Sequence, residues 1–300
     1  MRRLLAAALL LALAGCSSPS TPSATQPPST TTTSPATGDT RSPATGGTSL
    51  PRPAHVLVVV FENKEGSSVV GSADAPYLTS LARQGTYFSD AHGVTHPSEP
   101  DYLALFSGST QGVSSDACPL TFSGPNLAGE LMAAGHTFTG FSEDLPKAGF
   151  PGCSAGGYAR KHNPWVDFPA LPTEVNQPYS ALPSDLSTLP TVAFVIPNLC
   201  HDMHDCDVAT GDAWARAHLG GYVHWAHDHD GLLIVTFDEN DGSAGNRFAT
   251  FVVGPMVRAG TSDQRIDHYS VLRTLEDMYG LARIGKSADA APITGVWTGS

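Results

Sequence analysis

Positive charge is scarce in this chain. Its 300 residues carry 16 lysines and arginines against 28 aspartates and glutamates, which gives a formal net charge of −12 at pH 7. Because nucleic-acid binding depends on clustered basic side chains, the composition argues against nucleic acid as a partner. The same shortage argues against simple electrostatic attraction to anionic lipid. An anionic ligand would have to be held by local groups in a pocket.

Long apolar runs are equally scarce. Residues 4–13 follow a charged start and are too short to span a membrane, and no second run of spanning length follows. A charged start, an apolar run and a small-residue end predict a secretory signal over residues 1–16. Its end, Leu13-Ala14-Gly15-Cys16, resembles the lipobox of bacterial lipoproteins. Cys16 would then carry a lipid anchor to the membrane; a plain cleaved signal is the alternative.

The next segment has almost no residues that could form a core. Residues 17–53 are nearly all Ser, Thr, Pro, Ala and Gly, which cannot bury enough apolar surface to offset the chain entropy of folding. We expect a disordered tether here. Residues 54–300 then form one catalytic domain, since about 250 residues suit a single large α/β domain.

Cysteine is rare, with five in the whole chain. Setting Cys16 aside leaves Cys118, Cys153, Cys200 and Cys206, and an even number in an exported chain predicts two disulfides. The close pair Cys200 and Cys206 would bridge one loop, which leaves Cys118 with Cys153. The alternative is a zinc site built from the cysteines and histidines of residues 200–206, although their spacing matches no common zinc module.

Strand and helix patterns alternate along the predicted domain. The expected strands are residues 56–61, 137–141, 192–196, 232–237 and 248–253, and the expected helices are residues 75–85, 98–107, 125–135, 212–227 and 269–279. This alternation predicts an α/β fold with a mostly parallel central sheet and helices on both faces. Residues 146–188, rich in Pro, Gly and Asn, are expected to form an irregular insertion that roofs the site.

Two of the apolar strands lead straight into carboxylates and amides. Glu62 and Asn63 follow the first strand, and Asp238 and Glu239 follow residues 232–237. In open α/β sheets ligands bind beyond the carboxyl ends of the strands, so these four side chains should meet at one edge. Their oxygen atoms suit one hard divalent cation, Mg²⁺, Mn²⁺ or Ca²⁺, better than Zn²⁺. The alternative is that they are solvated turn residues.

Ser98 is the candidate nucleophile. It stands before Glu99-Pro100, and a proline in the first helical turn places Ser98 near a helix N-terminus, where free N–H groups favour an anion. The simpler alternative is a helix-capping serine. The neighbouring His96, itself a candidate catalytic residue, and the two carboxylate clusters favour a nucleophile.

Several long blocks carry a family resemblance. They are FEN at 61–63, THPSEPDYLALFSGST at 95–110, GFSEDLP at 140–146, YARKHNPWV at 158–166, FVIPN at 194–198, DMHD at 202–205, TFDENDG at 236–242 and HYSVLRTLEDMYGL at 268–281. Over roughly residues 54–297 the chain resembles the bacterial acid phosphatase and phospholipase C (phosphoesterase) family of the alkaline phosphatase superfamily. The resemblance implies a three-layer α/β/α sandwich and a phosphoserine intermediate on Ser98.

The resemblance also implies roles for other residues. Asn198, Asp202, His204 and His268 fall where two-metal relatives build a second site, which in this branch holds no metal. His204 and His268 would instead clamp the phosphate as cations, and one would protonate the leaving alcohol. Asn198, Asp202 and Asp101 are candidate substrate-binding residues, although Asp101 departs from the family pattern, which has Asn there, and its exact role is open. His201 is unassigned, and His162 is interpreted as an ordinary surface or satisfied histidine.

Together these observations predict an exported, metal-dependent phosphatase that hydrolyses phosphate monoesters, with small phosphorylated substrates that include phosphoinositides as candidates. A phosphodiesterase of phospholipase C type is the first alternative. A noncatalytic lipoprotein that binds a phosphorylated ligand is the second.

Overall fold

The computed structural model describes residues 50–243 and 245–299, which belong to one compact unit. The predicted signal segment, Cys16 and residues 17–49 of the predicted tether lie outside the described residues. Residues 50–53 are neither helix nor strand. No helix in the described part of the chain is both long and apolar enough to cross a membrane.

A nine-stranded sheet forms the centre of the fold. Its strands are β1 (His55–Phe61), β2 (Thr86–His92), β3 (Phe138–Ser142), β6 (Asn176–Pro178), β7 (Val192–Ile196), β8 (Gly231–Phe237), β9 (Arg247–Val253), β10 (Gly260–Ser262) and β11 (Ile266–Asp267). Their order is β10-β2-β9-β8-β1-β7-β3-β6, and β11 pairs with β2. Strand β9 is antiparallel to β2 and β8, whereas the other pairs are parallel.

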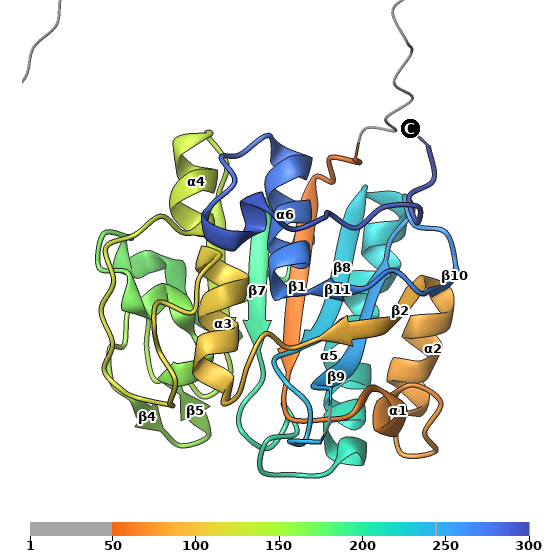
Figure 1. Cartoon of the computed structure of the whole chain (residues 1–300), viewed down its shortest axis with the longest axis horizontal. Coiled ribbons are helices and arrows are strands. Elements are labelled where there is room, and N and C mark those ends of the chain that lie inside the picture. The colour runs from red at the N-terminus through yellow and green to blue at the C-terminus, as the bar shows by residue number, and fades with distance from the viewer. Residues whose placement is uncertain (1–49, 244, 300) are drawn as a thin grey trace, which may run out of the picture. The chain divides into compact units, whose positions relative to one another are not determined.

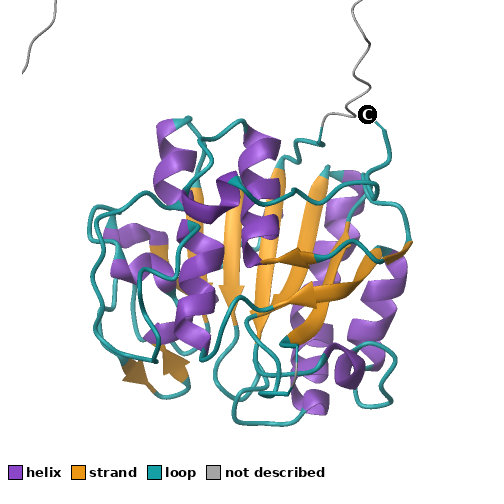
Figure 2. Cartoon of the chain, viewed as in Figure 1, coloured by secondary structure: helices purple, strands orange, loops and turns teal. Residues whose placement is uncertain are grey.

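Helices cover both faces of this sheet. They are α1 (Gly66–Val69), α2 (Pro76–Gln84), α3 (Ser98–Ser107), α4 (Leu127–Ala133), α5 (Val208–Asp228) and α6 (His268–Tyr279). Helices α3, α4 and α6 contact one another in front of the sheet in Figure 1, whereas α5 lies behind it and contacts α2. Figure 2 shows the same layers by type of element. The three-layer α/β/α arrangement predicted from the sequence is confirmed.

The insertion is made of short pieces. It holds the hairpin of β4 (Ser154–Ala155) and β5 (Tyr158–Ala159), strand β6, and the 3₁₀ helices η1 (Arg160–His162), η2 (Pro164–Asp167), η3 (Thr173–Val175), η4 (Tyr179–Ala181) and η5 (Leu186–Thr188). A last 3₁₀ helix, η6 (Gly285–Ala288), follows α6. Strand β6 joins the edge of the main sheet beside β3, so the insertion is part of the sheet as well as a cover.

The parallel strands β1, β7 and β8 position the polar residues that follow them. Strand β8 is entirely buried and pairs with β1 over its full length, with Phe61 opposite Phe237. Residues 56–61 of β1 and the whole of β7 are also buried. Because these strands run in the same direction, the segments after Phe61, Ile196 and Phe237 emerge at one edge of the sheet.

Candidate active site

Two carboxylate segments meet at this edge, as the sequence predicts. Glu62 and Asn63 follow β1, and Asp238 and Glu239 follow β8. The Asn63 N–H donates to Asp238 Oδ1 at 3.1 Å, and the Asn63 side-chain amide donates to Glu62 Oε2 at 2.9 Å. Asn63 has a positive φ of 53°, a conformation that asparagine tolerates better than most residues. This tight turn brings together two segments that are 175 residues apart.

Ser98 lies directly against these carboxylates. It is the first residue of α3 and is 1% exposed. Its Oγ lies 3.1 Å from Glu62 Oε2 and 3.3 Å from Glu239 Oε1. The cap position before it is Pro97, and no side chain caps the helix there. Ser98 therefore points its hydroxyl into the carboxylate cluster instead of capping its own helix.

The cluster has the electrostatics of a cation site. Burial raises the pKa of Glu62 well above its usual value, and nearby Asp238 and Asp202 raise it further. Burial also raises the pKa of Asp238 to about 6. Burial and Asp238 raise that of Glu239 to about 7. The buried Asp238 Oδ2 has no hydrogen-bond partner among the described residues. Such closely spaced buried carboxylates favour protonation unless a cation neutralises them, so these residues fit a divalent ion.

His162 belongs to the site, contrary to its interpretation as an ordinary histidine. It is 1% exposed, its Nε2 lies 3.1 Å from Glu62 Oε1, and its Nδ1 lies 3.2 Å from Asp202 Oδ2. The ring stacks on that of Tyr102, whose hydroxyl donates to Glu62 Oε1 at 2.6 Å. Burial, with Lys161 and His204 nearby, lowers the pKa of His162 well below its usual value. The imidazole is therefore neutral and can donate a lone pair to a metal.

Two histidines near Glu62 add nitrogen atoms to the oxygen ligands that the sequence predicts for the cation. Glu62, His162 and His204 each offer a ligand atom, and these atoms lie within 4.8 Å of one another. The sequence prediction placed only oxygen atoms around the cation and gave His204 a role as a phosphate clamp. Imidazole suits Zn²⁺ and other transition metals as well, so the donors present admit a softer cation than Mg²⁺ or Ca²⁺.

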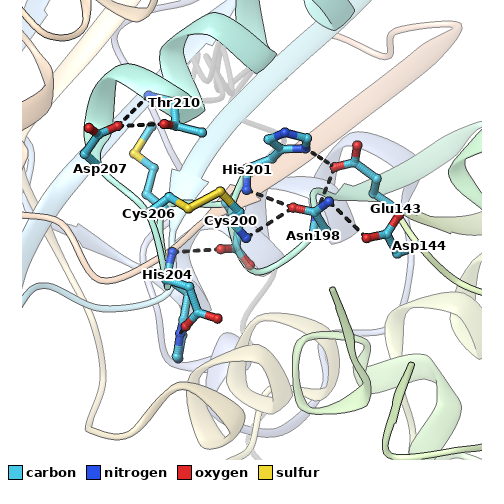
Figure 3. The surroundings of a disulfide bond; sticks show 12 residues. Glu143, Asp144, Asn198, Cys200, His201, His204, Cys206, Asp207 and Thr210 are labelled. Atoms are coloured by element: carbon cyan, nitrogen blue, oxygen red, sulfur yellow. Dashed lines mark hydrogen bonds and ion pairs between the residues drawn. A yellow bond between two sulfur atoms is a disulfide. The ribbon is translucent and has the colours of Figure 1, made fainter. Parts of the chain in front are cut away.

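His204 is fixed by its own loop, shown in Figure 3. Its N–H donates to Asp202 Oδ1 at 2.8 Å, and its Nδ1 lies 2.7 Å from Asp205 Oδ1. Its Nε2 lies 3.2 Å from the Lys161 Nζ. Since a lysine ammonium can only donate, Nε2 is the acceptor in this contact. Asp202 is fully buried, and burial raises its pKa to about 7.

Asn198 lies in a neighbouring cluster rather than against Ser98. Its N–H donates to Glu143 Oε2 at 3.0 Å, and its side-chain amide donates to Asp144 Oδ2 at 3.1 Å (Figure 3). The unassigned His201 joins the same cluster, with Nδ1 2.8 Å from Glu143 Oε2. The Asn198 side chain holds the turn that leads to His204, so it acts on the site through the backbone.

His96 lies at the mouth of the site. Its Nδ1 contacts Glu239 Oε2, and 43% of its side chain is exposed. The side chains of the other two histidines predicted to be catalytic are less exposed, at 29% for His204 and 1% for His268. His96 is therefore the most accessible of the three, and it also contacts a carboxylate that accepts from Ser98.

Asp101 and His268 form a buried pair that faces away from solvent. Asp101 is 0% and His268 1% exposed, and His268 Nδ1 lies 3.1 Å from Asp101 Oδ1. His268 Nε2 lies 2.9 Å from Phe237 O, and Asp101 Oδ1 also accepts the Val94 N–H at 2.8 Å. The ring of His268 thus faces buried groups of the fold, with Nδ1 at ion-pair distance from Asp101 and Nε2 hydrogen-bonded to the Phe237 carbonyl. This geometry supports a positioning role for the pair in place of the predicted phosphate contacts.

We expect His268→Ala to lower the free energy of unfolding by about 3–5 kcal/mol, because it leaves Asp101 buried without its partner. Although burial opposes it, Asp101 raises the pKa of His268. A raised histidine pKa stabilises the fold most below the unfolded pKa, and this stabilisation is lost as pH rises through the folded pKa. Denaturant unfolding at pH 5.5 and 8.5 should show a larger gap between wild type and variant at the lower pH. An equal gap at both would contradict a charged pair.

Both predicted disulfides are confirmed. Cys118 is joined to Cys153 and Cys200 to Cys206, with Cα–Cα distances of 5.9 Å and 4.7 Å. The second bond closes the loop that carries His204, as Figure 3 shows, and Asp202 lies between the same two cysteines in the sequence. The alternative zinc site at residues 200–206 is therefore not supported, because both of its sulfur atoms are consumed in the bond.

We expect opening the Cys200–Cys206 loop to reduce turnover about tenfold to a hundredfold, because small displacements of active-site groups are costly. The double variant Cys200→Ser/Cys206→Ser tests this, with Cys118→Ser/Cys153→Ser as the matched control for general loss of a disulfide. Comparable activity losses in both pairs at equal folded fraction would reject a specific effect on His204.

Apart from Cys16, titration of the denatured, unreduced protein should find no free thiol.

The comparisons with known proteins place this geometry in a family. The phosphoesterase family model matches residues 66–282. The chain is 49% identical over 252 residues to the phosphatidylinositol-3-phosphatase of Mycobacterium tuberculosis, covering 83% of this chain and 84% of that protein. It is 29% identical to the phosphate-repressible acid phosphatase of Penicillium chrysogenum, covering 70% of this chain but only 55% of the relative. The chain thus spans about half of the fungal enzyme.

A solved structure supports the fold. A protein of the alkaline phosphatase superfamily from Vibrio parahaemolyticus aligns with a TM-score of 0.53 and 14% identity, covering 82% of this chain and 72% of that one. The predicted fold class, enzyme class and family resemblance are confirmed by these comparisons. With most of its length matched by the family model and by a relative of 49% identity, the chain belongs to the phosphoesterase family.

Proposed function

We propose that this phosphatase hydrolyses phosphate monoesters by transferring the phosphoryl group to Ser98 with the help of a divalent cation. The observation that carries the proposal is the position of the Ser98 hydroxyl, at the first residue of α3 and within 3.1 Å of Glu62 and 3.3 Å of Glu239. A binding protein needs no such nucleophile. The residues that would hold the cation are Glu62, Asn63, Asp238, Glu239 and His162, whereas the ring nitrogens of His204 contact Lys161 and Asp205.

The proposed reaction has two halves. In the first, the Ser98 hydroxyl gives its proton to Glu62 or Glu239, to which it donates, its oxygen bonds to phosphorus, and the bond from phosphorus to the ester oxygen breaks. The leaving oxygen takes a proton from His96, which contacts Glu239 and is accessible at the mouth. In the second, a water molecule gives a proton to His96 as its oxygen bonds to phosphorus, the bond from phosphorus to the Ser98 oxygen breaks, and the carboxylate returns its proton to Ser98 as phosphate leaves. When bound, the cation lowers the pKa of a coordinated hydroxyl and offsets the phosphate charge.

The proposed substrates are small phosphomonoesters, with phosphoinositides as the first class to examine. The support is the relative at 49% identity, which is named a phosphatidylinositol-3-phosphatase. Hydrolysis rates for phosphoinositides, nucleotides and sugar phosphates, measured in parallel with a chromogenic monoester and a chromogenic diester, test the substrate class. Faster turnover of the diester would favour the phospholipase C alternative. Binding without turnover of any of these would favour the noncatalytic one.

We also propose that the enzyme is exported and anchored in the membrane through Cys16, on the strength of the lipobox-like sequence that ends at this residue. Expression of Cys16→Ser in a bacterium that processes lipoproteins tests the anchor. The variant should move from the membrane fraction to the periplasm or medium. Equal membrane association of wild type and variant would reject a lipid at Cys16.

A further inference from the structure

A lysine and a helix N-terminus converge on one carboxylate beside Ser98. The Glu99 N–H, in the first turn of α3, donates to Asp116 Oδ1 at 3.1 Å. The Lys161 Nζ donates to the other oxygen, Asp116 Oδ2, at 2.8 Å. Asp116 lies between α3 and α4, and its side chain is 31% exposed. The Glu99 N–H and the Lys161 ammonium thus bind the two oxygens of one carboxylate, which is the arrangement of a bidentate anion site.

Lys161 is held in place on the side of the insertion. It belongs to η1, whose neighbouring Arg160 donates to Asp167 at 2.7 Å and to the Pro151 carbonyl at 2.7 Å. Arg160 also donates to Leu120 O, at 2.9 Å. This buried network spans the insertion and the loop that carries Asp116. The Lys161 side chain is 18% exposed, so its ammonium group lies at a fixed place within the site.

Lys161 supplies a positive charge where the histidines do not. The two ring nitrogens of His162 lie against Glu62 and Asp202, and His204 Nε2 accepts from Lys161, so both rings are committed to partners within the site. The ammonium of Lys161 instead meets the N-terminus of α3 at Asp116, which accepts both from Lys161 and from the Glu99 N–H. A phosphoryl group on Ser98 would place its oxygens near this N-terminus, because Glu99 follows Ser98 directly.

We propose that the Lys161 ammonium and the Glu99 N–H bind the nonbridging oxygens of the phosphoryl group that Ser98 receives, and that Asp116 occupies this subsite until a substrate displaces it. The proposal rests on the proposed function of Ser98. A carboxylate and a phosphate both offer two oxygens to such a pair of donors. Because a phosphate carries more charge, each of the two hydrogen bonds stabilises it more than it stabilises a carboxylate. Since Asp116 is partly exposed and lies on a loop, rotation of its side chain is enough to vacate the subsite.

The first test removes the positive charge of the Lys161 side chain. Lys161→Met should lower kcat/KM for a monoester about 10²-fold to 10³-fold, the effect typical of deleting a donor that stabilises transition-state charge. It should also weaken inhibition by inorganic phosphate. Lys147→Met is the matched control, because Lys147 is an exposed lysine of the same insertion. A loss for Lys161→Met no larger than for Lys147→Met, at equal folded fraction, would overturn the subsite.

The second test removes the competing charge. Asp116→Asn keeps an oxygen that can accept the Glu99 N–H, so α3 retains a partner at its N-terminus. If Asp116 occupies the phosphoryl subsite, inorganic phosphate should inhibit Asp116→Asn at concentrations several-fold lower than wild type. If Asp116 serves only to position Lys161, phosphate inhibition should weaken and kcat should fall. An unchanged or weakened inhibition would contradict the displacement.

Calorimetry with inorganic phosphate separates failure of this proposal from failure of the proposed function. If wild type hydrolyses monoesters but Lys161→Met binds phosphate equally well and turns over normally, the subsite is wrong and the function stands. If wild type binds phosphate but hydrolyses no ester, the proposed function is wrong. Weaker phosphate binding by Lys161→Met, with no change for Lys147→Met, would then still support the subsite.

Discussion

Ser98→Ala is expected to reduce turnover by about 10³-fold or more, because it removes the group proposed to accept the phosphoryl. The fold should survive the change. The Ser98 hydroxyl only donates to Glu62 and Glu239, and alanine at the start of α3 removes no side-chain cap, since the structure has none there. Kinetics with a chromogenic monoester, together with thermal unfolding, measure both effects. Ser67→Ala, an exposed serine in α1, is the control.

Acid quenching with a labelled monoester adds a direct test of the covalent step. Wild type should retain label on a peptide containing Ser98, because phosphoserine survives acid, and Ser98→Ala should retain none. Retention of more than a tenth of wild-type activity by Ser98→Ala would reject Ser98 as the nucleophile. Loss of activity with no labelled peptide in wild type would instead indicate that Ser98 orients an attacking water.

The sequence predicted most of the buried framework. Continuous apolar runs such as residues 232–237 are typical of strands covered on both faces, and these became β1, β7 and β8. Strand β2 was missed because TYFSDAH mixes polar and apolar residues, and only part of it is buried. Strand β9 was predicted, but its antiparallel direction was not. Apolar content reports burial, whereas direction depends on the connection to the next strand.

The residues of the candidate site also fall into two groups, those that the sequence predicts and those that it does not. Glu62 and Asp238 could be predicted because their positions after two strands fix where they lie. His162 and Lys161 could not, because they follow a two-residue strand in an irregular insertion whose position depends on the buried Arg160–Asp167 pair. The block YARKHNPWV was the available signal, but it gave no direction for any side chain. His268 was assigned to the site through the family resemblance, yet its ring turns toward Asp101 and Phe237.

Removal of the cation is expected to silence the enzyme, and Glu62→Gln should do the same. Glu62 contacts Asn63, Ser98, Tyr102 and His162, so it joins the proposed nucleophile to two of the proposed cation ligands. We expect a loss of turnover of about 10³-fold. Glu174→Gln, which changes an exposed carboxylate of the insertion, is the control. Full activity in chelator, or normal activity of Glu62→Gln, would reject a catalytic cation. Metal analysis should find about one ion per chain.

Thermal stability gives a second readout for the cation that does not depend on turnover. The pKa values of about 6 for Asp238 and about 7 for Glu239 and Asp202 are raised by burial, so without a cation the folded state binds more protons than the unfolded state between about pH 4 and 7. The stability of the metal-free protein should therefore fall as pH rises through this window. A bound cation replaces those protons, so the increase in Tm that it produces should be larger at pH 7.5 than at pH 5.

Glu62→Gln should gain stability in chelator, because one source of repulsion is gone, and should respond less to added cation than wild type does. An equal response of wild type and variant at both pH values would show that the ion binds elsewhere.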